Sequence, residues 1–317
     1  MTDGTRVRAE YLRLVRPQRL MFSSSLESLR QRAQRDGGFA NLAGGEYRAD
    51  ATAWAILALS TAGVAKDLIG RARASLANRQ QGDGRVCISV DHPETYWPTP
   101  LAVLAWQGSP AYREPLSRAV RFLLATAGTH WARKADSAIT HDTSIRGWPW
   151  IADTHSMVEP TSLSLLALRV TGQGGHERAR EAVRMLMDRR LPKGGWNYGN
   201  TSVYGQELYP QVENTGLALT ALAGDVPPEE VRSSLNYLDA SIQSLRTPLS
   251  LGWGIMGLGA WGRRPVRARD WIMESFKRQE KYGPYDTMLL SLLVLAFHAR
   301  PGPTGVFGKM EGRTDGP

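Results

Sequence analysis

Six stretches of this sequence share one form: a threonine or proline near the start, followed by a run of small and aliphatic residues. They lie at 48–63, 98–109, 158–172, 212–224, 246–262 and 285–299. Each is apolar on nearly every face, which predicts a helix that is buried on all sides. A membrane span needs about 20 apolar residues, so these shorter runs indicate core helices. We expect the polar residues at their starts to act as N-caps. The anchor threonines are Thr52, Thr99, Thr161, Thr215, Thr247 and Thr287.

Amphipathic, arginine-rich segments alternate with these runs along the chain. They lie at 26–34, 67–80, 112–127, 176–190, 228–245 and 266–280. A one-sided helix that alternates six times with a fully buried helix predicts two concentric rings. The expected fold is therefore all-α, an (α/α)6 toroid with six inner and six outer helices. It makes 25–300 one domain, with an N-terminal extension at 1–24 and a disordered tail at 301–317.

Composition limits the function classes. Hydrophobic residues make up 42% of the chain, enough for a large core, and the net charge is +9. The arginines are interspersed with acids, so we expect no nucleic-acid partner and leave open peripheral contact with an anionic membrane. The single cysteine, Cys87, excludes an intrachain disulfide, and we expect no metal and no cofactor. The first residues contain arginines without an apolar segment of the secretory type, so we expect a cytoplasmic protein.

The ring geometry predicts where a site would be. Inner helices of such a toroid run parallel, so their N-termini gather at one mouth. The connections that lead into the inner helices are long and aromatic, whereas the connections that leave them are short. Loops elaborated on one face indicate that the functional residues lie there.

Three glycine-aromatic connections, RDGGF, RGWPW and KGGWNYG, each lead into an inner helix. They resemble the QW-type repeats of the squalene-hopene cyclase and prenyltransferase superfamily, over roughly residues 25–300. The resemblance implies an isoprenoid lipid or prenyl diphosphate as ligand, held by aromatic side chains. The residues so implied are Trp54, Trp97, Trp148, Trp150, Trp196, Tyr198 and Trp253. From the residues alone, the Trp-Gly motifs can also staple neighbouring helices together.

Class II cyclases of this superfamily carry a D-x-D-D-T-A motif whose middle aspartate protonates the substrate. The segment RADATA aligns with it, which places Asp50 at the acid position and replaces the flanking acids by Arg48 and Ala51. A nearby arginine favours the ionised carboxylate, which is unsuited to an acid. Because of its place in the motif we still rank Asp50 first, followed by Asp153 and Glu159, which lie in or beside the most aromatic connection.

Two other function classes remain open. The missing acids of the motif favour a non-catalytic isoprenoid binder, or a prenyltransferase-like subunit that needs a helical partner. Prenyltransferases of this group hold zinc, and here only Asp153 and His155 offer a pair of ligands, with no third. Tryptophans and carboxylates at the mouth would also suit an (α/α)6 glycosidase, although its inner helices are usually less aliphatic.

Overall fold

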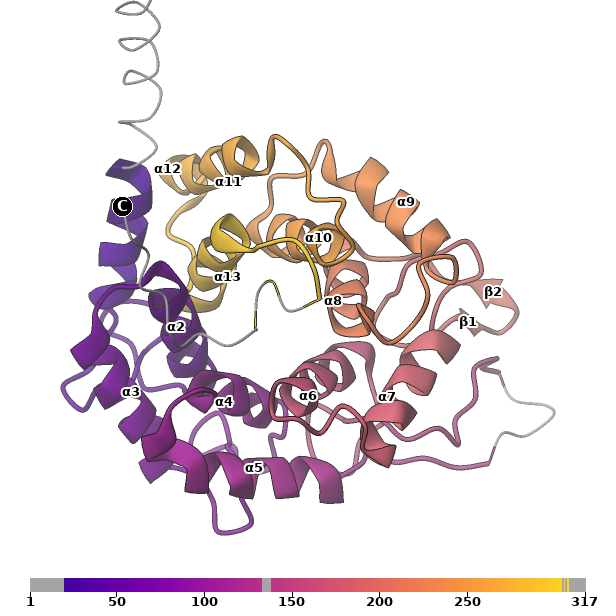
Figure 1. Ribbon diagram of the computed structural model, residues 1–317, viewed down its shortest axis with the longest axis horizontal. Coiled ribbons are helices and arrows are strands. Elements are labelled where there is room, and N and C mark those ends of the chain that lie inside the picture. Colours follow the sequence, from indigo (N-terminus) through magenta and orange to yellow (C-terminus); the bar gives the residue numbers. More distant parts are fainter. Residues whose placement is uncertain (1–19, 133–137, 304, 306, 308–317) are drawn as a thin grey trace, which may run out of the picture.

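The computed structural model describes residues 20–132, 138–303, 305 and 307. Its helices form two concentric rings (Figure 1). The inner helices are α2 (Ala49–Ala62), α4 (Pro98–Trp106), α6 (Val158–Val170), α8 (Val212–Leu222), α10 (Pro248–Ala260) and α13 (Thr287–His298). The outer elements are the helical residues 20–30, α3 (Lys66–Asn78), α5 (Arg113–Ala125), α7 (Glu177–Asp188), α9 (Arg232–Ile242), α11 (Ala268–Lys277) and α12 (Gln279–Tyr282). The predicted α/α toroid is confirmed.

The inner ring closes on itself, because each inner helix packs against the next and α13 packs against α2. The tightest contact is between α8 and α10. A Cβ atom on Gly216 would lie 2.4 Å from the backbone carbonyl of Trp253, so only glycine allows the two helices to approach this closely. The remaining regular elements in the described residues are a short 3₁₀ turn, η1 (Pro110–Tyr112), and a hairpin of β1 (Ser202–Val203) and β2 (Gln206–Glu207).

The anchor threonines hold the loops to the inner helices, and the N-cap prediction for them is wrong. The hydroxyls of Thr52, Thr99, Thr161 and Thr215 each accept a hydrogen bond from a loop N–H, at 2.9–3.0 Å. Each hydroxyl therefore joins a loop to its inner helix, and none of these helices has a side-chain hydrogen bond from its N-cap residue. Five of the six threonines have no exposed surface, whereas Thr247 is exposed. The side chain that does cap an inner helix is Asp286, which accepts from Leu289 N.

A second set of hydrogen bonds links each repeat to the next around the mouth. The backbone carbonyls of Asn41, Ile88, Trp150 and Tyr198 accept from N–H groups at the start of the preceding inner helix, at 2.9–3.3 Å. The bond from Thr287 N to Asn41 O joins the last repeat to the first. The four residues make the same backbone contact but have different side chains. The contact between repeats therefore does not determine which side chain stands at this position.

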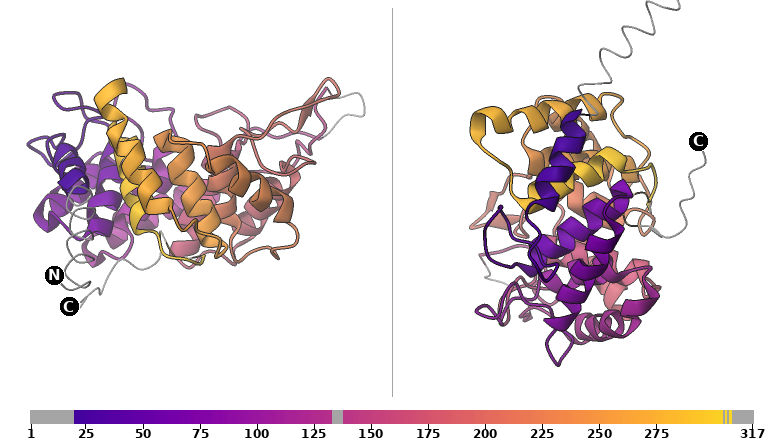
Figure 2. Two further views of the ribbon diagram at one scale, coloured as in Figure 1. Left: turned by 90° about the horizontal axis from the view of Figure 1, so that it is seen from above. Right: turned by 90° about the vertical axis from the view of Figure 1, so that its left-hand side faces the viewer.

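The opposite face is covered by short turns and by the start of the C-terminal tail (Figure 2). Gly302 N donates to Gly259 O at 3.0 Å, and Phe307 is buried against the core. The stretch that we expected to be disordered therefore begins with residues packed on the ring, while 308–317 and most of 1–24 lie outside the described residues. None of the described helices has the length and apolar character needed to cross a bilayer.

Candidate functional site

Four inner helices carry a distinctive side chain two residues before the buried threonine. The four residues are Asp50, Trp97, Glu159 and Glu213. Two residues correspond to about 200° of helical rotation, so these side chains point away from the wall that holds the threonine and toward the middle of the mouth. Position in the repeat thus brings three carboxyl groups and an indole to the same level of the ring.

Asp50, the acid that the sequence ranked first, is committed to an ion pair. Arg48 Nε donates to Asp50 Oδ1 at 3.0 Å and Arg48 Nη2 donates to Oδ2 at 2.9 Å. The Asp50 side chain is buried, and a bidentate guanidinium is the strongest partner for an ionised carboxylate. This geometry counts against Asp50 as a proton donor.

Glu159 lies in the opposite electrostatic environment. Burial raises the pKa of the Glu159 carboxyl, a hydrogen bond from Trp150 opposes the rise, and the neighbouring Glu213 adds to it. The side chain is half-buried, so it stays accessible to a ligand. A carboxyl group whose neutral form is favoured while it remains reachable is suited to donate a proton.

Trp150 is held over Glu159 by the backbone around it. Its carbonyl accepts from Tyr96 N at 2.7 Å, and the next loop turn is tied down by Ala152 N, which donates to Glu94 O at 2.9 Å. The ring of Trp150 meets that of Tyr198 edge-on, with centroids 5.9 Å apart. Tyr198 is 48% exposed, so this aromatic pair is accessible from solvent beside the Glu159 carboxyl group.

The second carboxyl group is oriented by a residue that the sequence analysis missed. The hydroxyl of Ser250, in the first turn of α10, donates to Glu213 Oε2 at 2.8 Å. Ser250 does not stand at the position of a buried threonine, and no glycine-aromatic loop leads into α10. Its position in the first turn of an inner helix is the sequence feature that could have identified Ser250 as a site residue.

The middle of the ring is filled with side chains. Trp54 of α2 and Trp253 of α10 meet with centroids 6.0 Å apart, although α13 separates these helices in the ring. They are only 1% and 3% exposed. These two tryptophans, which we expected to line a substrate cavity, thus form a packed floor roughly six residues, or about 9 Å, below the helix starts.

Two further residues that we expected to bind substrate are packed between the outer and inner helices. Trp148 Nε1 donates to Leu123 O at 2.9 Å and Trp196 Nε1 donates to Leu186 O at 2.6 Å, and both rings are buried. These indoles fasten α5 and α7 to the inner ring, as the stapling interpretation of the motifs predicts, and are not available to a ligand. Trp97 is half-buried at the start of α4, beside Trp150.

The remaining predicted residues lie away from the carboxyl pair. Asp153 is exposed in a turn with φ of 58°, in the left-handed region, so it lacks the burial that an acid needs. His155 contacts the ring of Trp131, with centroids 4.8 Å apart. Burial raises the pKa of the Cys87 thiol, which points to Pro93 O. The described residues contain no cluster of three metal-ligating side chains.

No family model matches the chain, and no curated protein matches it. A structure of the type II terpene cyclase MstE from Scytonema, with geranylgeranyl dihydroxybenzoate, is 13% identical, covers 88% of this chain and 99% of its own, and has a TM-score of 0.60. The α-1,6-mannanase GH76A of Salegentibacter sp. is 12% identical over 87% of this chain and 98% of its own, with a TM-score of 0.59. A Clostridium perfringens α-amylase is 9% identical, covers 86% of this chain and 97% of its own, and has a TM-score of 0.57. At these identities the similarity establishes the toroid alone.

Proposed function

We propose that this protein cyclises an isoprenoid by protonating it, with Glu159 as the acid. The observation that supports this most strongly is the environment of Glu159, where burial favours the neutral carboxyl group and no arginine is paired with it in the described contacts. In the proposed step the Glu159 proton passes to one carbon of an alkene, the π electron pair forms the new C–H bond, and the other carbon becomes a cation. A second alkene of the chain then attacks this cation, which forms the C–C bond of the ring and leaves a new cation. The Glu159 carboxylate takes a proton from a carbon beside that cation, which forms the final C=C bond and restores the neutral acid.

The residues around Glu159 suit a cationic intermediate. Trp150 and Tyr198 place aromatic rings beside the carboxyl group, and aromatic faces attract a cation through their quadrupoles. Glu213, oriented by Ser250, places a second carboxyl group beside this position. The similarity to the terpene cyclase MstE, which spans 99% of that chain, supports the same reaction class and a prenyl-chain substrate.

Exposed apolar side chains on the mouth loops support delivery of such a substrate from a membrane. Leu42, Val90, Ile151, Tyr204 and Tyr209 are between 38% and 88% exposed and all belong to the connections that lead into the inner helices. Tyrosines and aliphatic residues favour the boundary between headgroups and acyl chains. We infer a cytoplasmic protein that makes peripheral membrane contact through its mouth, and we expect vesicles to retain the wild type more than a Tyr204→Ser and Tyr209→Ser double variant.

A glycosidase is the second candidate, because two carboxyl groups on adjacent helices have unlike partners. Glu159 is favoured in its neutral form while Glu213 accepts from Ser250, which is the asymmetry that an acid and a base require. The similarity to the mannanase is as extensive as that to the cyclase. A non-catalytic isoprenoid binder, or a subunit that needs a helical partner, is the outcome if neither reaction occurs.

The deciding experiment is a product assay with three proteins: the wild type, Glu159→Gln and Asp50→Asn. Each is incubated with squalene, oxidosqualene, C10–C20 prenyl diphosphates (roughly the sizes that ligand sites accommodate) and α-1,6-manno-oligosaccharides. A cyclic terpenoid made by the wild type and Asp50→Asn but not by Glu159→Gln supports the proposal. Shortened oligosaccharides would establish the glycosidase instead. Substrate recovered unchanged but bound would indicate the binder.

A further inference from the structure

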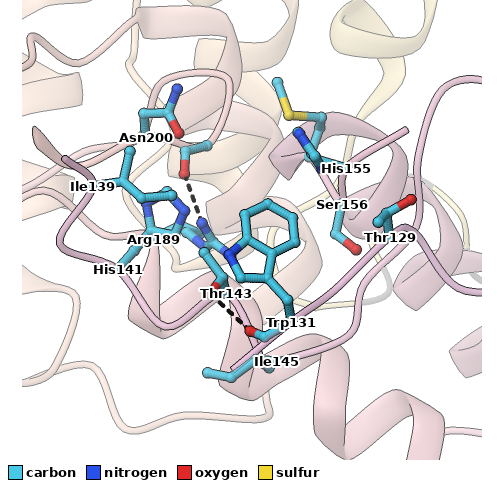
Figure 3. Close-up of a pocket in the computed structure, with 12 residues that line it drawn as sticks. Thr129, Trp131, Ile139, His141, Thr143, Ile145, His155, Ser156, Arg189 and Asn200 are labelled. Carbon is cyan, nitrogen blue, oxygen red and sulfur yellow. Dashed lines mark hydrogen bonds between the residues drawn. The ribbon is translucent and has the colours of Figure 1, made fainter. Parts of the chain in front are cut away.

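A cavity lies between the connection that precedes α6 and the connection that follows α7 (Figure 3). Its volume is about 310 Å³, which is within the range of small-molecule sites. Trp131 and His155 form its aromatic side, and Arg189, His141 and Asn200 contribute polar groups. Met157, the residue before α6, and Gly199, which follows Tyr198, also line it.

Arg189 is the feature that requires an explanation. This arginine follows the last residue of α7 and is only 5% exposed. Burial lowers the pKa of Arg189 to about 10, against the opposing effect of Asp188 and Asp142, so the side chain is still a cation at neutral pH. Placing a cation at such a position is costly unless its donors find partners.

The known partners of Arg189 use only part of its hydrogen-bonding capacity. Nη1 donates to Gly199 O and Nη2 donates to Asp142 O, each at 3.2 Å. Nε lies 3.4 Å from Asp188 Oδ2 but makes no hydrogen bond within the described part of the chain. A guanidinium has five N–H donors, so the two carbonyls do not use all the donors of this residue, which lines the cavity.

The described side chains that line the cavity include no acid. Its described lining contains Arg189 and two histidines but no carboxylate. Two other hollows on the mouth face contain Glu46 and Asp91, so the absence of acids here is a local property. The Trp131 ring is 39% exposed and lies edge-on to His155, and Figure 3 shows this indole beside Arg189, so the cavity has a flat apolar surface next to its cation.

We propose that this cavity is a binding site for a compact organic anion, a carboxylate or phosphate carried on a flat body. The anion binds the guanidinium of Arg189 and the body packs on Trp131. A clamp between two loops would need only the two hydrogen bonds to carbonyls, and explains neither the aromatic wall nor the spare donors. This site does not depend on the reaction proposed for Glu159.

The test is calorimetric titration of the full chain with benzoate, phenyl phosphate, inorganic phosphate and the uncharged benzyl alcohol. We expect one of the two aromatic anions to bind with one site per chain, at least tenfold tighter than inorganic phosphate and than benzyl alcohol. The preferred anion identifies the ligand as a carboxylate or a phosphate. Arg189→Gln should weaken this binding at least tenfold, and Trp131→Ala should weaken it several-fold. Arg180→Gln, an exposed arginine on α7, is the matched control and should bind like the wild type.

Because Arg189 also joins two loops, its replacement could unfold the region. Asn200→Trp provides an independent variant, since it introduces a large side chain at an exposed lining position and leaves Arg189 itself unchanged. Loss of binding in Asn200→Trp, with an unchanged circular dichroism spectrum, supports the site. The proposal is overturned if no anion binds, if benzyl alcohol binds as well as benzoate, or if folded Arg189→Gln and Asn200→Trp bind like the wild type.

Discussion

Asp50 and Glu159 occupy the same place in two repeats, two residues before a buried threonine, yet their surroundings differ. Asp50 receives two hydrogen bonds from Arg48, its neighbour in sequence. Glu159 instead faces the indole of Trp150 and a second carboxyl group from the adjacent helix. An equivalent position in the repeat therefore fixes where a carboxyl group lies but not whether it is protonated. Its local partners decide the chemistry.

The largest expected effect separates these two carboxyl groups by activity. Glu159→Gln should lower turnover by about 10²–10⁴, the usual contribution of a general acid, because the amide cannot donate a comparable proton. Asp50→Asn should stay within about tenfold of the wild type, since Asp50 is not the donor. Steady-state rates of product formation measure both, and equal losses in the two variants would remove the distinction.

The ion pair that holds Asp50 can be broken from its other side. Arg48→Met leaves a buried carboxylate without its partner, which should reduce the free energy of unfolding by about 1–3 kcal/mol; removing the partner of a fully buried pair costs more, but Arg48 is about one-third exposed. Denaturant unfolding measures the loss. The double variant Arg48→Met and Asp50→Asn should recover part of it, and simple additivity would show that the pair contributes nothing.

The repeat joint offers a comparison of threonines. Thr161→Val removes the acceptor of the Trp148 backbone N–H and leaves that buried donor unpaired. The change should lower the free energy of unfolding by about 1–3 kcal/mol. Thr247→Val is the matched control on an exposed position, where the change should stay within about 0.5 kcal/mol. Thermal and chemical unfolding of both variants check this, and similar losses would contradict the assignment of Thr161 as a joint.

The smallest effect is one of pH on stability. The raised pKa of Glu159 means that the folded protein holds this proton more tightly than the unfolded chain, so the wild type loses stability as pH rises above the ordinary glutamate value of 4.5. Glu159→Gln has no such loss and should melt higher at neutral pH, by about 2–4 °C. The difference should disappear at acid pH. A constant difference across the range would show that burial does not shift this group.

The toroid could be predicted from the sequence because its signal is local and repeated. Most inner and outer helices begin and end within a few residues of the predicted segments; for example, 158–172 corresponds to α6 and 176–190 to α7. The first outer segment is the exception, since the sequence predicts it at 26–34 and the described helical residues are 20–30. The role of the threonines could not be deduced in the same way. Their loop partners lie 13 or 19 residues earlier, and an N-cap is the simpler local interpretation.

The candidate site was only partly predictable. The mouth and its acids followed from helix polarity, and the sequence already indicated that Arg48 disfavours Asp50 as the acid. The shift at Glu159 depends on Trp150 from a loop and Glu213 from the next helix, contacts that no spacing reveals. Trp148 and Trp150 stand two residues apart, yet one fastens the wall and the other reaches the mouth.

The central claim is that the Glu159 carboxyl group is neutral when the protein is at work, and infrared difference spectroscopy tests it most directly. The spectrum of Glu159→Gln is subtracted from that of the wild type at neutral pH, and the same subtraction with Glu213→Gln serves as the control. We predict a C=O stretching band of a protonated carboxyl group in the first difference spectrum, and the second spectrum shows whether a band at that frequency belongs to Glu159 and not to Glu213. Carboxylate bands in both would show that Glu159 is ionised, and would contradict its role as the acid.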